Sequence, residues 1–293
     1  MNSDDTTEPP QITEHEVEIN GLKVFYREAV RPSGAPASPD AEAAPVLYIH
    51  GVPTHSGDWI PFLEKSGGFA IDLPGFGRSS KPSPSDFSYS ITGYDEVLRK
   101  LPDALGLDSF SLVVHDWGGL ALYTASQMPD RIERLVIINS VPLLPGYRWH
   151  RIARLWRTPV VGELGMGFTT KFVAKRLLRE ANATPGPMPD AFVDMFWKQF
   201  NFETQRAILK LYRHADPDVL TNAGADLGLI TAPALVIWGA QDPYLPTSFA
   251  HAYADALPNG TARVVEGAGH WAWIDKPEIL DEVTDFLLTG NTA

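Results

Sequence analysis

Short runs of consecutive apolar residues recur along the chain, separated by stretches in which apolar residues return with helical spacing. Continuous runs rich in Val, Ile and Leu are typical of strands buried on both faces, as in a parallel sheet covered by helices. The runs that predict such strands are residues 46–49, 69–71, 110–114, 135–138, 235–238 and 263–265. Their alternation with helical stretches predicts an α/β fold with a mostly parallel sheet and helices on both of its faces.

The N-terminal part of the chain has a different pattern. Two strand-like runs, residues 17–19 and 22–26, flank the dipeptide Asn20-Gly21. This dipeptide suits a two-residue hairpin turn because both positions tolerate a positive φ. We therefore expect the chain to open with an antiparallel hairpin.

Three segments fall outside the alternation of strands and helices. Residues 1–11 are acidic and polar, which predicts a disordered tail, and residues 31–44 are rich in Pro and Ala, which predicts a long surface loop. Residues 141–228 have a helical pattern throughout. This pattern predicts a helical lid inserted over the carboxyl edge of the sheet, between core segments 12–140 and 229–293.

Composition limits the classes of function. The 293 residues include no cysteine, which excludes thiolate nucleophiles, disulfides and Cys-based metal sites. The formal net charge of −12 would repel phosphate backbones and anionic lipid, so we expect neither a nucleic-acid nor a membrane partner. No metal-binding cluster or phosphate loop is visible in the sequence. The expected reactants are a small uncharged organic substrate and water, without a cofactor, and the oligomeric state stays open.

Targeting patterns are also missing from the sequence. Residues 1–10 have neither the basic start nor the apolar run of a signal peptide. No window approaches the ~18 apolar residues that a membrane span needs. We therefore expect a cytoplasmic protein.

The stretch from Leu112 to Gly119 carries the clearest chemical pattern. It is an apolar strand that ends in Asp116, followed by Trp117, two glycines and a helical pattern. This order is typical of a nucleophile elbow, a strained strand-to-helix turn that presents one side chain above the sheet. A carboxylate there can displace a leaving group at a saturated carbon and form an ester with the enzyme. The alternative is that Asp116 only caps the following helix.

Two further residues follow later strands. Asp242 comes after the strand at 235–238, and His270 after the strand at 263–265. Both side chains are expected at the same sheet edge as Asp116, in the hydrolase order of nucleophile, acid and base. Taken singly, Asp242 could be a turn aspartate before Pro243 and His270 a loop histidine.

The motif His50-Gly51-Val52-Pro53 follows the strand at 46–49. A turn of this kind can direct the N–H of Val52 inward, where with the N–H of Trp117 it would form an oxyanion hole. We expect His50 and His115 to be structural hydrogen-bonding residues rather than bases.

With these motifs in this order, residues 15–289 resemble the α/β-hydrolase superfamily, and specifically its Asp-nucleophile branch of epoxide hydrolases and haloalkane dehalogenases. The resemblance implies that Asp116 forms a covalent ester, which a water activated by His270 and Asp242 hydrolyses. In epoxide hydrolases, lid tyrosines protonate the opening oxirane oxygen. Tyr212 resembles the second lid tyrosine in context and spacing, and Tyr147 is the candidate for the first.

Dehalogenases hold the departing halide between two N–H donors. Trp117 fits the first donor, but epoxide hydrolases carry the same Trp, so this residue does not distinguish the two branches. Trp149, Trp156 or Trp197 could supply the second donor. Val114 and the Pro53-Thr54 pair look dehalogenase-like, whereas Val52 stands where dehalogenases often have Asn or Glu. The sequence thus favours an epoxide hydrolase, with a haloalkane dehalogenase as the alternative.

A non-catalytic hydrolase fold that binds a ligand or an acidic partner is a more remote alternative. Four arginines, Arg148, Arg151, Arg154 and Arg157, recur at helical spacing. They could contact such a partner or form a solvated helix face. A complete set of nucleophile, acid and base argues against a binding module, which needs none of them.

Overall fold

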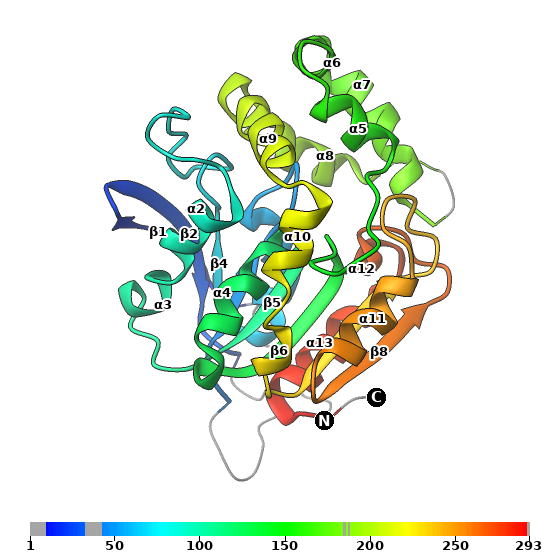
Figure 1. The fold of residues 1–293 in the computed structure, drawn as a ribbon. Helices are drawn as coiled ribbons and strands as arrows, with labels where there is room; N and C mark the ends of the chain where they lie inside the picture. Colours follow the sequence, from blue (N-terminus) through cyan, green and yellow to red (C-terminus); the bar gives the residue numbers. More distant parts are fainter. Residues whose placement is uncertain (1–9, 33–42, 184–185, 187, 292–293) are drawn as a thin grey trace, which may run out of the picture.

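The computed structural model describes residues 10–32, 43–183, 186 and 188–291. Within these residues one sheet is formed, with the strand order β1-β2-β4-β3-β5-β6-β7-β8 (Figure 1). The strands are β1 (Ile12–Ile19), β2 (Leu22–Ala29), β3 (Val46–Ile49), β4 (Gly68–Ile71), β5 (Phe110–Asp116), β6 (Ile132–Ser140), β7 (Ala234–Gly239) and β8 (Gly260–Val265). Neighbours from β4 to β8 are parallel, whereas β2 is antiparallel to both β1 and β4. The predicted α/β fold is confirmed.

The N-terminal hairpin turns at Asn20 and Gly21, which have φ values of 55° and 76°. Both of its strands are longer than the apolar runs at 17–19 and 22–26. For β1 the reason is that the strand lies at the edge of the sheet, where most of its residues are exposed and polar side chains are tolerated. In β2 the added residues include the charged and half-buried Arg27 and Glu28, which leave no apolar trace in the sequence.

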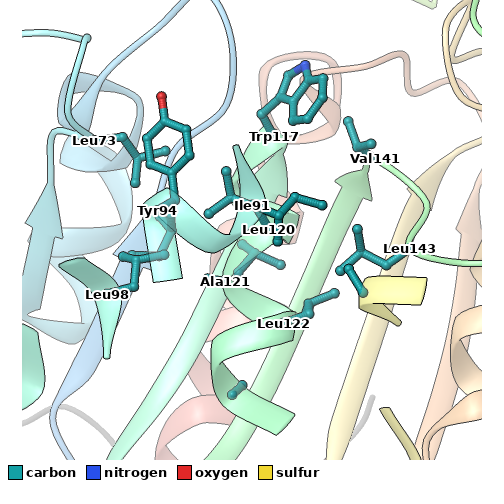
Figure 2. Packing of buried hydrophobic residues seen from close by; sticks show 14 of the residues in the cluster. Leu73, Ile91, Tyr94, Leu98, Trp117, Leu120, Ala121, Leu122, Val141 and Leu143 are labelled. Carbon is teal, nitrogen blue, oxygen red and sulfur yellow. The ribbon is translucent and has the colours of Figure 1, made fainter. Parts of the chain in front are cut away.

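The interior strands alternate their side chains between two hydrophobic layers. Val113 faces one layer, while Leu112 and Val114 on either side face the other. The layer around Leu112 is covered by α2 (Ile91–Leu98), α4 (Ala121–Gln127) and α11 (Ser248–Ala256), and Figure 2 shows side chains of α2 and α4 packed there. The layer around Val113 is covered by α1 (Ile60–Ser66) and α13 (Glu278–Thr289).

Between β6 and β7 the described residues form helices and no strand. These are α5 (Arg151–Arg157), α6 (Val161–Gly167), α7 (Lys171–Leu177), α8 (Asp190–Trp197), α9 (Phe202–His214) and α10 (Pro217–Ala223). In Figure 1, α5, α6 and α7 stand at the end of the molecule opposite the C-terminus. The 3₁₀ helix η5 (Leu227–Leu229) packs against α4, so the chain returns there to the sheet.

The remaining helices are short: α3 (Leu101–Ala104), α12 (Ala272–Asp275), η1 (Ser56–Trp59), η2 (Trp117–Leu120), η3 (Pro129–Arg131) and η4 (Leu178–Ala181). Most of the predicted tail, residues 1–9, and most of the predicted loop, residues 33–42, lie outside the described residues. In the described part of the chain, no helix has the length and apolar character to cross a bilayer.

Candidate active site

Asp116 is the last residue of β5 and has φ 48° and ψ −121°. A non-glycine residue with positive φ is strained, and it persists only where the surrounding structure fixes it. Close packing of the turn supplies that constraint. A Cβ at Gly118 would lie 2.1 Å from the carbonyl oxygen of Ile49, so only glycine lets the turn approach β3. The elbow predicted from the sequence is present as a strand, a tight turn and the helical segment η2–α4.

The Asp116 carboxylate faces two backbone donors. The N–H of Val52 donates to its Oδ1 at 2.7 Å, and the N–H of Trp117 also acts to lower the pKa of the carboxyl group. Gly51 permits this approach, since a Cβ there would lie 2.4 Å from the Cβ of Asp116. Burial raises the pKa of Asp116, against the lowering effects of the His270 charge and the two N–H groups. The structure thus brings both predicted oxyanion-hole residues to the predicted nucleophile.

His270 lies between the two predicted carboxylates. Its Nδ1 is 2.8 Å from Oδ2 of Asp242, and its Nε2 is 3.6 Å from Oδ2 of Asp116. The other oxygen of Asp242 accepts the N–H groups of Tyr244 and Leu245 at 2.8 and 3.1 Å. Burial acts to lower the pKa of His270, but the nearby carboxylates outweigh it and the pKa is raised.

Asn139, at the end of β6, was not predicted from the sequence. Its Nδ2 donates to Oδ2 of Asp242 at 2.6 Å, and its Oδ1 accepts the N–H of Gly239 at 3.0 Å. It therefore holds the Asp242 carboxylate against the end of β7. The sequence offered one signal, a polar residue at the carboxyl end of a buried apolar strand.

The two other predicted histidines make backbone hydrogen bonds. His50 donates from Nδ1 to the carbonyl of Gly51 and accepts the N–H of Leu73 at Nε2. His115 donates from Nε2 to the carbonyl of His270 at 3.0 Å. Burial lowers the pKa of both, that of His50 to about 4. His115 thus joins the end of β5 to the loop that carries His270, and His50 joins its own turn to Leu73 beyond β4.

A cavity of about 660 Å³ opens above Asp116 and His270, and most of its wall is apolar. Tyr212 of α9 lines it, with its ring edge-on to Trp117 at 4.8 Å. Burial raises the pKa of Tyr212 well above its usual value of 10, so the phenol keeps its proton. Tyr147 is buried beside Trp149 and Phe249 and is not on the cavity wall.

The three candidate tryptophans take different positions. Trp149 stacks on Trp117, with ring centroids 5.7 Å apart and planes 21° apart. Trp156 lines the cavity, with its ring 5.1 Å from that of Tyr212. Trp197 packs on Phe196 and Phe200 instead.

Two cavity residues, Tyr244 and His150, were also missed in the sequence. The Tyr244 ring meets His270 edge-on at 5.1 Å, and the His150 ring lies 5.0 Å from Tyr244. Burial and the His270 charge lower the pKa of His150 to about 4. Tyr244 follows Asp242 by two positions in a turn, and that closeness was the available signal.

Asp58 in η1 is a third buried carboxyl group close to His270. Its Oδ2 accepts a hydrogen bond from Thr54 and lies 3.5 Å from Nε1 of Trp271, the residue after His270. Its Oδ1 is buried without a hydrogen-bond partner among the described residues. Burial raises the pKa of Asp58 to about 7.

Replacing Asp58 with Asn should raise the melting temperature in mildly alkaline buffer. Because the folded pKa lies above the ordinary 3.8, neutral Asp58 contributes stability that is complete below about pH 4 and is lost as pH rises through about 7. Asn is neutral at every pH, so the gain at pH 8 is at most about 4 kcal/mol, at about 1.4 kcal/mol per pKa unit. Thermal unfolding of both proteins between pH 4 and 8 measures it, with Asp130→Asn on the surface as control. Equal melting temperatures at pH 8 would refute the raised pKa.

Comparisons with known proteins show which family the chain belongs to. The model of the alpha/beta hydrolase family matches residues 46–283. Epoxide hydrolase 1 of Caenorhabditis elegans is 29% identical over 266 residues, 81% of this chain, which spans only 63% of that relative's length. A haloalkane dehalogenase of Mycolicibacterium paratuberculosis is 31% identical over 221 residues, 70% of this chain and 69% of that protein.

A solved structure gives the same picture of the fold. The crystal structure of a haloalkane dehalogenase from Bradyrhizobium elkani superposes with a TM-score of 0.77 at 26% sequence identity, over 94% of this chain and 98% of that one. The similarity therefore extends through the helical segment between β6 and β7 as well as the sheet. Because one family model spans most of the sequence, this protein belongs to the α/β-hydrolase family.

Proposed function

We propose that this hydrolase converts epoxides into vicinal diols through an ester formed on Asp116. The observation that carries the choice of substrate is the position of Tyr212, a protonated phenol on the wall of the cavity that also contains Asp116 and His270. An opening oxirane leaves an alkoxide that must gain a proton, and a phenol can donate it. The similarity to an epoxide hydrolase of Caenorhabditis elegans supports the same choice.

In the first half-reaction, Oδ2 of Asp116 attacks an oxirane carbon. The carbon–oxygen bond of the ring breaks, and the oxirane oxygen takes the Tyr212 proton. Oδ1 stays bonded to the Val52 N–H and becomes the carbonyl oxygen of the new ester. The nucleophile thus enters the reaction already oriented by the group that later stabilises the oxyanion.

In the second half-reaction, Nε2 of His270 takes a proton from water, and the hydroxide attacks the ester carbon of Asp116. The developing oxyanion on Oδ1 accepts the N–H groups of Val52 and Trp117. Collapse of the intermediate releases the diol and restores the carboxylate, and the His270 proton returns to Tyr212. Esterification removes one of the negative charges that raise the pKa of His270, so this pKa falls and the imidazole is neutral, and able to accept a proton, at the step that needs a base.

The helices between β6 and β7 act as a lid in this proposal. Helices α5, α6, α7, α8 and α9 all contribute residues to the cavity wall. The wall is mostly apolar, which favours an uncharged organic substrate. Excluding water other than the attacking molecule would strengthen the hydrogen bonds around the oxyanion.

Haloalkane dehalogenation is the second candidate, and it rests on a separate observation. The indole N–H groups of Trp117 and Trp149 are both buried without a hydrogen-bond partner among the described residues, and the two rings are stacked. An unpaired buried donor costs about 1–3 kcal/mol, which an anion between the two groups would offset. The similarity to haloalkane dehalogenases supports this alternative.

Replacing Tyr212 with Phe tests the choice between the two reactions. The substitution should lower kcat for epoxide opening by ~10² to 10⁴, because it removes the proton donor while keeping the ring that packs on Trp117. Halide release from bromoalkanes needs no such proton. Diol formation and halide release are to be measured on the same preparations, with Tyr244→Phe as the matched control on the cavity wall.

Trp117→Phe gives the complementary result. It keeps the backbone N–H of the oxyanion hole and removes an indole donor, so it should affect epoxide opening mainly through packing. If Tyr212→Phe leaves diol formation unchanged while Trp117→Phe eliminates halide release, the protein is a dehalogenase and the first proposal is wrong. If the protein turns over neither epoxides nor bromoalkanes, the result favours the alternative of a non-catalytic hydrolase fold that binds a ligand.

A further inference from the structure

Exposed apolar side chains are concentrated on helices α5, α6 and α7. Of the twelve large apolar residues exposed in the described chain, eight lie between residues 155 and 177. We call these eight the cap face: Leu155, Val160, Val161, Leu164, Phe168, Phe172, Val173 and Leu177. Phe168 and Phe172 are 77% and 79% exposed. Exposed apolar residues on ordinary surface are scattered singly, so this concentration on one short segment marks an interaction site.

The cap face is continuous with the cavity above Asp116. Four of its members, Leu155, Phe168, Val173 and Leu177, also line the cavity. The same side chains therefore meet both solvent and the cavity interior, which places the cavity mouth on this face. An apolar molecule that enters from this side would contact apolar side chains both at the mouth and along the cavity wall.

The charge around the cap face is opposite to that of the whole chain. The chain has a formal net charge of −12, yet residues 148–179 contain eight basic residues and one acidic residue, Glu163. Several of these basic residues pair with acidic neighbours, among them Arg151 with Glu180. Arg148, Arg154 and Arg176 are exposed and have no acidic partner among the described residues.

A second copy of the chain is a poor match for this surface. In a two-fold symmetric dimer the same patch lies on both sides of the interface, so the basic residues of one cap face would oppose those of the other. An anionic lipid surface meets both requirements, since its headgroups attract Arg and Lys and its acyl layer accepts exposed Leu and Phe.

We propose that the cap face docks on an anionic lipid surface and presents the cavity mouth to the bilayer. Phe168 and Phe172 enter the boundary between headgroups and acyl chains, and Arg148, Arg154 and Arg176 contact the headgroups. A lipophilic substrate dissolved in the bilayer then reaches Asp116 without crossing water. The net charge of −12 predicts no membrane partner, but the charge is unevenly distributed, and the basic residues between 148 and 179 attract anionic headgroups to this one face.

Vesicle sedimentation tests the proposal without any turnover, so its outcome is independent of the reaction that the site catalyses. The full chain is mixed with vesicles of phosphatidylcholine alone or of phosphatidylcholine and phosphatidylglycerol in equal parts. Binding should be stronger to the anionic vesicles and should weaken with salt. The double variant Leu164→Ser/Phe172→Ser, at positions outside the cavity wall, should lower the partition coefficient by about tenfold per side chain.

Matched variants separate the cap face from general surface effects. Phe202→Ser/Val219→Ser removes two exposed apolar residues elsewhere and should leave binding unchanged. Arg154→Glu/Arg176→Glu should lower binding to anionic vesicles about tenfold or more, whereas Lys65→Glu/Lys100→Glu, with the same change in net charge, should not.

Three results would overturn the proposal. One is wild-type protein that stays in the supernatant with both kinds of vesicle. Another is equal loss of binding in the cap-face variants and their controls. The third is a wild-type protein that self-associates in sedimentation velocity, binds neither kind of vesicle, and loses its self-association in the variant Leu164→Ser/Phe172→Ser. The cap face would then join copies of this chain.

Discussion

Asp116→Ala is expected to abolish turnover of epoxides and bromoalkanes alike, with a loss in kcat of at least roughly 10⁴-fold. The expectation follows from geometry, because Asp116 Oδ2 is the carboxylate oxygen beside His270 Nε2, and the Val52 N–H holds the other oxygen. Among the residues that the structure describes, the Val52 N–H donates to no other carboxylate. Diol and halide assays on homogeneous protein measure the loss. Retention of a tenth of wild-type activity would refute the covalent mechanism.

Asp116→Gly is the matched control for folding. Glycine accepts the positive φ of this position, whereas alanine keeps the strain. Glycine relieves about 1–3 kcal/mol of strain and costs about 0.5–1 kcal/mol for its extra freedom in the unfolded chain. The Gly variant should therefore melt at a higher temperature than the Ala variant. Both variants should be inactive. Loss of activity accompanied by gain of stability separates a catalytic role from a structural one.

Much of the fold could be predicted because burial leaves a direct trace in the sequence. Strands such as β5 and β7 are buried on both faces and appear as unbroken apolar runs. The edge strand β1 was predicted too short, since its exposed positions are polar and leave no apolar trace. The hairpin could be predicted from the residue types of its turn, because Asn20 and Gly21 adopt the positive φ values that Asn and Gly tolerate.

The predicted site residues could be brought together because parallel strands end at one edge of the sheet. Asp116, Asp242 and His270 each follow such a strand, so the topology alone places them near one another. Asn139 and Asp58 could not be assigned in this way. The contact of Asn139 with Asp242 depends on the register of β6 with β7, and the contact of Asp58 with Trp271 depends on how η1 packs under that residue. No local sequence pattern indicates the register or the packing.

The helical segment between β6 and β7 shows where sequence patterns are weakest. The helical spacing of its arginines at 148, 151, 154 and 157 predicts a solvated face or a contact for an acidic partner. In the structure Arg148, Arg151 and Arg154 are exposed, whereas Arg157 turns inward to the carbonyls of Tyr212 and Ala215. Helical periodicity predicts that helices form here, but it does not predict which helix faces contact one another. Those contacts depend on how the short helices pack together.

His270→Gln is expected to consume one equivalent of substrate and then stop, leaving an ester on Asp116. The first half-reaction needs Asp116 and a proton donor, whereas only the second needs a base for water. Glutamine can still bond to Asp242 but cannot take the proton that His270 Nε2 would take. Intact-protein mass spectrometry after addition of an epoxide should therefore show a persistent adduct, and peptide mapping should place it on Asp116.

The control for this experiment is His150→Gln, which changes a histidine on the same cavity wall whose ring nitrogen Nδ1 accepts a hydrogen bond from the N–H of Ala153. It should turn over substrate and show no adduct, because His150 has no part in activating water in this mechanism. Hydrolysis of the isolated adduct can be followed as pH is raised, and it should stay slow in the His270 variant because free hydroxide replaces the base only inefficiently. If His270→Gln shows no adduct and leaves the substrate unconsumed, His270 acts before ester formation, and the division of labour between Asp116 and His270 proposed here is wrong.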